Sequence, residues 1–274
     1  MRRTMFGTAW RYAVLLAAAL LTVLPLWWMV AASLMPSGEA NAFPPRLWPS
    51  RPTLLQYDTL FARLKLARAA ANSLLIAGAT TALSLLLNSM AGYAFAKLHF
   101  AGRERVFRGL LAALVIPGQI AMLPLFLMLK QLGLINTYAG VILPGMASIF
   151  GIFLVRQYAQ SIPDTMLDAA RVDGASEWRI YWSLVLPVCR PILVTLGLFT
   201  FMGAWNDFLW PLVVLTDGDR YTLPVALANL VGEHVQDTEL MMAGAVLTVL
   251  PVVVLFLALQ RFYIAGVMGG SLKG

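Results

Sequence analysis

Long apolar runs separated by short polar segments dominate this chain. Six runs hold about 20 or more predominantly apolar residues, the length that a helix needs to cross the ~30 Å hydrocarbon core of a bilayer. They cover residues 12–34, 71–96, 107–129, 138–157, 191–215 and 240–260. The pattern therefore predicts an all-α membrane protein with six transmembrane helices, organised as a single transmembrane domain over residues 1–274.

The first run is predicted to be a retained helix and not a cleaved leader. Arg2 and Arg3 precede it, as basic residues precede a signal peptide. It is too long for the apolar part of a leader, no small-x-small cleavage site follows, and Pro25 and two tryptophans lie inside it.

Composition supports a membrane protein and excludes several classes of site. Hydrophobic residues make up 60% of the chain and charged residues 12%, about half the charged share of soluble domains. The net charge of +7 is more typical of cytoplasmic loops than of a nucleic-acid surface. Cys189 is the single cysteine, so no internal disulfide can form, and the two histidines, His99 and His234, lie too far apart to suggest a metal site.

The distribution of basic residues predicts the orientation. If both termini are cytoplasmic, seven of the 20 lysines and arginines fall in outside loops and the other 13 fall inside. This bias favours cytoplasmic N- and C-termini. The cluster Arg63, Lys65 and Arg68 argues the other way, in a loop (35–70) whose pattern predicts a short amphipathic helix.

The segment 160–187, between the fourth and fifth runs, is unusually charged for this chain. Pro163 and Asp164 begin a helix, because proline fits the first turn and an acid favours the positive helix end. Asp173-Gly174 predicts a stop and turn, since glycine tolerates positive φ. Ser176 can then cap a second helix that runs to Pro187 and into the fifth run. The residues alone leave two interpretations open, an ordinary amphipathic loop or a docking element on the cytoplasmic side.

The spacing in this segment resembles the EAA signature of permeases of ATP-binding-cassette (ABC) importers. The signature reads E-A-A, three residues, Gly, nine residues, Ile, one residue, Leu-Pro. Here Asp168 and Leu184 replace the Glu and the Ile, and every interval matches. In that family the loop is a coupling helix that docks on the ATP-binding subunit. The resemblance therefore implies an ATPase-coupling role for Asp168, Ala169, Ala170, Asp173, Gly174, Ala175, Leu186 and Pro187.

The resemblance extends along about nine tenths of the chain and indicates a permease of the maltose type. Four further segments have sequences that resemble those of carbohydrate importer permeases: residues 92–103, 116–144, 201–212 and 260–274. It implies the type I ABC importer permease fold, an inner-membrane location and a sugar or related polyol as substrate. It also implies a heterodimer with a second permease, two ATP-binding subunits, an extracytoplasmic sugar-binding protein and, as in some relatives, contact of the Lys273-Gly274 tail with the ATPases.

The chain carries no nucleotide site or catalytic constellation of its own. A G-x-x-x-x-G-K-[ST] motif is absent from the sequence, so ATP and Mg²⁺ are expected on the partner ATPases. A transport subunit is therefore expected, not an enzyme, with no nucleic-acid partner. A secondary transporter of a small polar solute is the alternative, but it predicts internal repeats and more intramembrane ionisable groups. A membrane enzyme is a third reading, for which no catalytic residues are visible.

A few polar residues in the apolar runs are candidates for the substrate pathway. Asp207 lies beside Asn206 and Trp205, and an ionisable group at membrane depth usually faces a cavity or a partner. A tryptophan face is suited to stacking on a sugar ring. Gln119 follows Pro117-Gly118, which predicts a broken helix in the third run. Packing remains the alternative for Gln119, Asn206 and Asp207, as interhelical hydrogen bonding is expected for Asn72 and Asn88.

Overall fold

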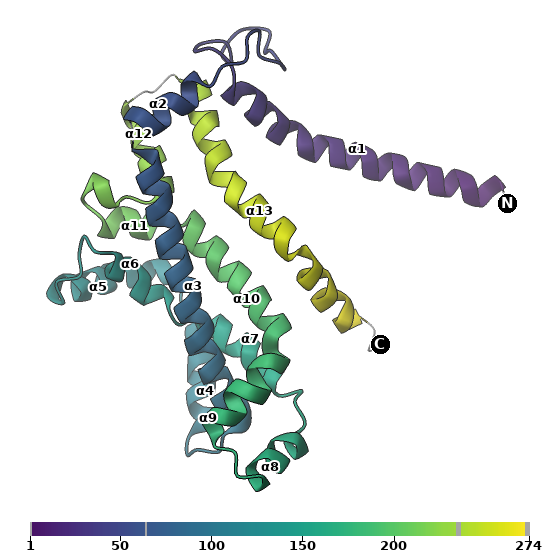
Figure 1. The fold of residues 1–274 in the computed structure, drawn as a ribbon, viewed down its shortest axis with the longest axis vertical. Coiled ribbons are helices and arrows are strands. Elements are labelled where there is room, and N and C mark those ends of the chain that lie inside the picture. Colours follow the sequence, from purple (N-terminus) through teal and green to yellow (C-terminus); the bar gives the residue numbers. More distant parts are fainter. Residues whose placement is uncertain (1, 64, 234–236, 272–274) are drawn as a thin grey trace. The chain divides into compact units, whose positions relative to one another are not determined.

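The computed structural model describes residues 2–63, 65–233 and 237–271, and its regular structure there is entirely helical. The Lys273-Gly274 tail and His234 lie outside the described residues. The helices are α1 (Arg2–Ser33), α2 (Leu55–Arg63), α3 (Leu66–Lys97), α4 (Arg103–Ala113), α5 (Gly118–Gln131), α6 (Tyr138–Gly145), α7 (Ile149–Ala159), α8 (Asp164–Val172), α9 (Glu177–Ile180), α10 (Leu186–Asn206), α11 (Leu209–Val214), α12 (Leu223–Glu233) and α13 (Thr238–Ser271). Figure 1 shows them as a ribbon, and the all-helical fold class is confirmed.

The predicted spans correspond to straight helices and to bent pairs of helices. Among the described residues, four helices are long and apolar enough to cross a membrane, within Trp10–Ser33, Leu66–Lys97, Glu177–Asn206 and Thr238–Ala258. The pairs α4–α5 and α6–α7 raise the number to six if each pair is one span. Four of the six predicted runs therefore overlap single helices, and the third and fourth overlap the bent pairs.

The chain forms two compact units, residues 1–67 with 226–251, and residues 68–225 with 252–274. In the first unit, the loop after α1 is held to the start of α13, because the Ala40 N–H donates to Glu239 Oε1 at 2.7 Å. The α2 helix confirms the short helix expected within residues 35–70, and Leu60 buries its apolar side.

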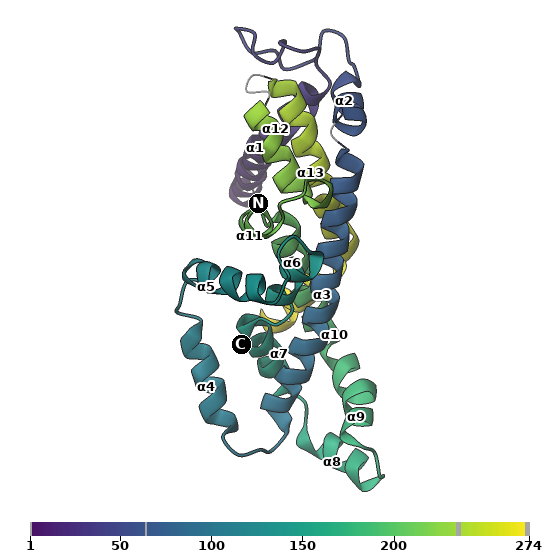
Figure 2. The ribbon, with the colours of Figure 1, turned by 90° about the vertical axis from the view of Figure 1, so that its left-hand side faces the viewer.

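The second unit is organised along α3. Figure 2 shows α5 running across the direction of α3, with α8 and α9 at the end of α3 where Lys97 lies. The asparagines of α3 bond neighbouring segments, as the sequence indicates. Asn72 donates to the carbonyls of Asp219 and Tyr221 at 3.1 and 3.0 Å, and Asn88 accepts from the Ser148 N–H at 3.0 Å.

The third predicted span is sharply bent, with 103° between α4 and α5. Residues 114–117 separate the two helices, and Pro117 is extended at φ −59°, ψ 130°. Pro117 disfavours helical backbone at the residue before it, which keeps α4 from continuing directly into α5, and Gly118 begins the new helix. The broken helix expected around Gln119 is therefore present.

The fifth span differs from its predicted limits, 191–215. The helix ends at Asn206, and α11 follows as a separate short helix. Asp207 is extended at φ −68°, ψ 123°, and its carboxylate accepts a hydrogen bond from the Trp210 N–H at 3.4 Å. A carboxylate that satisfies a free N–H at a helix start favours a new helix over continuation of the old one.

A close contact between α3 and α7 generates a stability prediction. A Cβ on Gly92 would lie 2.7 Å from Val155 Cβ, closer than side chains pack. Gly92→Ala should therefore cost about 1–3 kcal/mol as overpacking. Gly78→Ala, also on α3 but with open space around the new Cβ, is the control and should gain ~0.5–1 kcal/mol from helix propensity. The midpoint of thermal unfolding of the purified protein measures both, and equal midpoints would contradict the contact.

Candidate functional site

Two regions of the second unit contain the residues singled out by the sequence. The first is the coupling segment, residues 160–187, formed by α8, a turn, α9 and the start of the following helix. The second is a cavity lined by residues of α3, α5, α6, α10 and α11.

The turn of the coupling segment is a Schellman motif. Gly174 has φ +79°, and its N–H bonds the Arg171 carbonyl at 3.0 Å while the Ala175 N–H bonds the Ala170 carbonyl at 2.9 Å. These two bonds satisfy carbonyls that α8 would otherwise leave free at its C-terminus. Ser176 then caps α9, because its hydroxyl accepts the Arg179 N–H at 3.3 Å. The helix, turn and cap predicted from the sequence are all present.

The second helix of the coupling segment continues into the fifth span without a gap. Residues Tyr181–Val185 form a π-helical turn between α9 and α10. Pro187 has no N–H to donate, and its ring would crowd a normal α-helical turn before it. A wider π turn is a known way to accommodate such an irregularity. Leu186 and Pro187 therefore lie where the coupling segment is joined rigidly to the span.

Arg171 links the two sides of the turn. Its Nε donates to Glu177 Oε1 at 2.7 Å, and its NH1 donates to Asp168 Oδ1 at 2.8 Å. The bonds to Glu177 and Asp168 raise the pKa of Arg171, so the guanidinium stays charged. Asp168 is thus engaged inside the segment, with part of its carboxylate still exposed to other partners.

The outer surface of the coupling segment is exposed at its tip. Val172 is 87% exposed, unusual for a valine in a helix, and Ala169, Asp173 and Gly174 are exposed beside it. A cavity of about 280 Å³ lies next to them. Its lining brings together three predicted residues, Ala170, Asp173 and Ala175, with Arg179, Ile180, Ser183 and Leu184. The motif residues around the turn therefore form one accessible surface, whereas Leu186 and Pro187 lie at a separate cavity farther along the chain.

The inner side of the coupling segment packs into a hydrophobic cluster. Its buried members include Leu167 of α8, Ile180 of α9 and Tyr93 of α3. Burial of these side chains holds α8 and α9 against α3 and α7 by the hydrophobic effect. The segment is therefore part of the folded unit and not a free loop.

A polar stripe on α3 holds this segment, and the sequence analysis did not identify it. Ser89, Tyr93 and Lys97 recur every four residues, which places them on one face of the helix. The Ser89 and Tyr181 hydroxyls are 2.7 Å apart, and the Tyr93 hydroxyl donates to Glu177 Oε2 at 2.5 Å. The signal that would have found them is this spacing of polar groups in an otherwise apolar helix.

Lys97 is the charged member of the stripe and is buried. Its side chain is only 7% exposed, and its Nζ donates to the Ile162 carbonyl at 2.6 Å and to Asp164 Oδ1 at 2.7 Å. The hydrogen bond from Lys97 lowers the pKa of the Asp164 carboxyl. A buried ammonium needs such partners, because an unpaired one is costly. The ion pair therefore fixes the entry of α8 to the end of α3.

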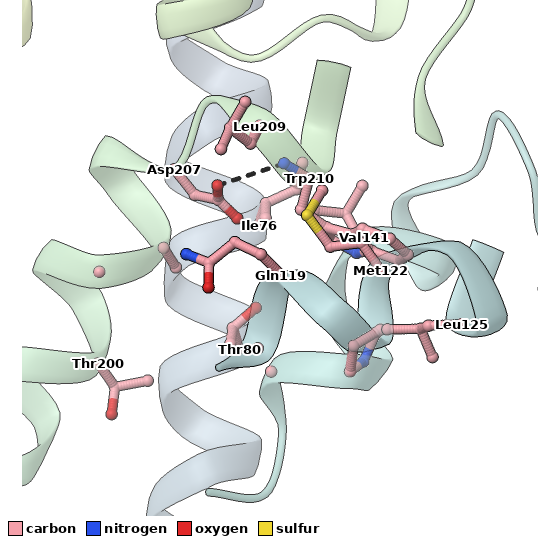
Figure 3. A pocket seen from close by; sticks show the side chains of 15 residues that line it. Ile76, Thr80, Gln119, Met122, Leu125, Val141, Thr200, Asp207, Leu209 and Trp210 are labelled. Atoms are coloured by element: carbon pink, nitrogen blue, oxygen red, sulfur yellow. Dashed lines mark hydrogen bonds between the residues drawn. The ribbon is translucent and has the colours of Figure 1, made fainter. Parts of the chain in front are cut away.

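The cavity has a volume of about 480 Å³ and receives two of the predicted pathway residues. Asp207 lines it from the break after α10, and Gln119 lines it from the start of α5. Figure 3 shows their polar groups projecting into the same space, near Thr80 of α3. Trp210 also lines it, and its indole N–H donates to the Gly140 carbonyl at 3.2 Å.

The structure places the other two predicted pathway residues elsewhere. Trp205 is 1% exposed, lies outside the cavity lining and stacks on Phe201 with ring centroids 6.0 Å apart. Asn206 donates to the Met202 carbonyl at 2.9 Å within α10. Trp210 is therefore the tryptophan beside Asp207 at the cavity, where the sequence analysis had chosen Trp205. Within the described ranges, no three His, Cys, Asp or Glu side chains gather as ligands of a metal would.

Comparison with known protein families identifies one match. The model of the binding-protein-dependent transport system inner membrane component matches residues 84–268, more than half of the chain. The matched range includes both the coupling segment and the cavity-lining residues of α5, α6, α10 and α11.

Several characterised proteins are similar over nearly the whole length. The arabinooligosaccharides transport system permease protein AraQ of Halalkalibacterium halodurans is 40% identical over 259 residues, covering 93% of each chain. The lactose transport system permease protein LacG of Rhizobium radiobacter is 34% identical, covering 94% of each chain.

Solved structures with a similar fold come from a bacterial ABC transporter that imports the acidic polysaccharide alginate. One chain superposes with a TM-score of 0.82 at 24% identity, covering 95% of this chain and 97% of the other. A chain from that transporter in complex with its alginate-loaded periplasmic protein gives a TM-score of 0.55 at 16% identity, covering 93% of this chain and 94% of the other. At these identities the likeness concerns the fold.

Proposed function

The chain belongs to the family of binding-protein-dependent transport system inner membrane components and is a permease component of a carbohydrate ABC importer, and we propose that it couples to cytoplasmic ATPase subunits through the coupling segment. The single observation that carries this proposal is the geometry of that segment. Its inner side is packed and hydrogen bonded to α3, while its tip exposes Asp168, Ala169 and Gly174 of the EAA spacing. A force-transmitting contact needs both a rigid base and an accessible surface.

The proposed substrate is an oligosaccharide, a disaccharide or a related sugar derivative. The relatives named for arabinooligosaccharides and lactose support this class. The cavity fits it, because Asp207, Gln119 and Thr80 supply hydrogen-bonding groups among apolar side chains. We propose that this cavity forms part of the translocation pathway, of which this chain supplies half.

The proposed assembly contains this chain, a second permease as heterodimeric partner, two ATP-binding subunits and an extracytoplasmic sugar-binding protein. A chain with one coupling segment serves one ATPase, so two ATPases require two permeases. ATP and Mg²⁺ are bound by the ATPases in this proposal, and the chain itself carries no cofactor. The family name supports placement in the inner membrane, and the solved complex with a periplasmic protein supports the extracytoplasmic partner.

The coupling role is tested by changing the tip of the segment. Gly174→Leu should leave the permease pair assembled but reduce binding of the ATPase subunits by about tenfold, equivalent to ~1.4 kcal/mol. A Cβ at this position meets nothing within 4 Å in this chain, so apart from the backbone strain of a positive φ the added bulk is directed at the partner. Asp168→Arg places a second cation beside Arg171 and should act in the same direction. Co-purification and sugar-stimulated ATP hydrolysis measure both variants.

Gly102→Leu is the matched control for this experiment. Gly102 has φ +82° and open space around it, so both glycine variants carry the same backbone strain of about 1–2 kcal/mol. Only Gly174 lies in the coupling segment. Normal stimulation in Gly174→Leu and in Asp168→Arg would show that the segment is merely a connection between helices.

The proposed orientation, with cytoplasmic N- and C-termini, rests on the distribution of basic residues, and the two ends of α3 supply the positions that test it. The loop at Gly218 lies at the N-terminal end, where Arg68 and Asp219 pair at 3.0 Å, and Ala101 follows the C-terminal end. About 30 helical residues, ~45 Å, separate these ends, enough to cross the bilayer. Single cysteines from Ala101→Cys and Gly218→Cys, in a Cys189→Ala background, should be labelled from the cytoplasmic and outer sides, respectively. An impermeant thiol reagent applied to intact and to opened cells reports this, and the reverse labelling would overturn the orientation.

The pathway role is tested at Asp207. Asp207→Asn keeps an oxygen that can accept the Trp210 N–H but removes the charge from the cavity, so it should lower sugar transport while the assembly retains its thermal stability. Asp207→Ala also removes the acceptor and should cost about 1 kcal/mol of stability. Uptake of labelled sugar and the unfolding midpoint separate the two effects. Unchanged uptake in Asp207→Asn would exclude the residue from the pathway.

A further inference from the structure

The coupling segment is fastened to a span that is not its neighbour in the sequence. The order of the chain joins it to α7 before it and to α10 after it, where α9 leads through the π turn into the fifth span. It is also fastened to α3 by the polar stripe, Ser89, Tyr93 and Lys97, over two helical turns. This third connection does not follow from the order of the chain.

The contacts of the stripe reach every part of the coupling segment. Lys97 binds the entry of α8 through Ile162 and Asp164. Tyr93 binds Glu177 at the start of α9, and Glu177 binds Arg171 across the turn. Ser89 bonds Tyr181 in the π turn. A displacement of the segment is therefore resisted at its beginning, middle and end by one helix.

The N-terminal half of the same helix lines the cavity. Ile76 and Thr80 of α3 contribute to the cavity wall, together with Thr200, Gly203 and Ala204 of α10. From Lys97 back to Thr80 the helix rises ~25 Å without a break. A straight, hydrogen-bonded helix moves as a rigid body over such a length, whereas the bent pair α4–α5 has a break between its helices.

We propose that α3 is a second transmission helix, and that Ser89, Tyr93 and Lys97 are positioning residues that carry movement of the coupling segment to the cavity through α3. This inference rests on the proposed coupling function. The covalent path through α10 moves the part of the cavity wall that α10 forms, and the stripe moves the part that α3 forms together with it. Without the stripe, movement of the segment would reach the α3 part of the wall less directly.

The test separates coupling from assembly. The double variant Tyr93→Phe/Lys97→Met removes the side-chain hydrogen bonds of both residues at nearly constant volume, and Met avoids stranding a buried charge. In proteoliposomes holding the permease pair, the ATPases and the binding protein, ATP hydrolysis should persist. The number of sugars transported per ATP should fall by about three- to tenfold, within the range by which broken networks change coupling.

Two matched variants control for general disruption. The single variant Lys97→Arg keeps a cation able to reach the same acceptors and should show the wild-type sugar-to-ATP ratio. Tyr158→Phe removes a hydroxyl from a tyrosine packed against the same hydrophobic cluster and should leave the ratio unchanged. A double variant that keeps the wild-type ratio would overturn the inference.

A second measurement decides the question even if the double variant fails to assemble. Spin labels attached after Leu86→Cys on α3 and Thr165→Cys on α8, in a Cys189→Ala background, report the distance between helix and segment by pulsed electron paramagnetic resonance. The distance should be the same with the ATPases empty and with ATP trapped. A changed distance would show that the segment moves independently of α3 and would overturn the proposal. Normal stimulation in Gly174→Leu would instead remove the coupling function itself, so the two failures are distinguishable.

Discussion

The structure of the second unit depends on one constraint, that the polar side chains of an apolar helix must find their partners within the protein. Hydrocarbon offers none, and each unsatisfied group costs several kcal/mol there, by order of magnitude. On α3 this constraint acts at both ends. Asn72 bonds the loop at Asp219 and Tyr221, and Lys97 bonds the linker before α8. The positions of the two loops relative to α3 follow from these few bonds.

Local features of the sequence were sufficient to predict the coupling segment. A positive-φ glycine, a serine cap and a proline after the second helix act over a few residues, and each appears in the structure at Gly174, Ser176 and Pro187. Hydrophobic run length likewise located the spans, because the thickness of the bilayer fixes it. The family resemblance in the EAA spacing was confirmed by the match over residues 84–268.

Features that depend on which helix faces which could not be predicted in the same way. Trp205 and Trp210 are five residues apart in the same apolar run, yet Trp205 packs on Phe201 while Trp210 lines the cavity. The difference arises because α10 ends at Asn206 and Asp207 redirects the chain into α11. The stripe on α3 was missed for a related reason. A tyrosine and a lysine near a helix end suggest a membrane interface until the burial of Lys97 is known.

The Tyr93–Glu177–Arg171 chain of bonds has a consequence for exchanging parts between permeases. Glu177 and Arg171 belong to the coupling segment, but Tyr93 lies some eighty positions earlier in the sequence, on another helix. A segment grafted alone into a permease without a donor at the position of Tyr93 would leave Glu177 without this hydrogen bond. The part that would have to be exchanged is therefore discontinuous in sequence: the coupling segment together with one face of α3. Recombination within this family would be expected to preserve them as a pair.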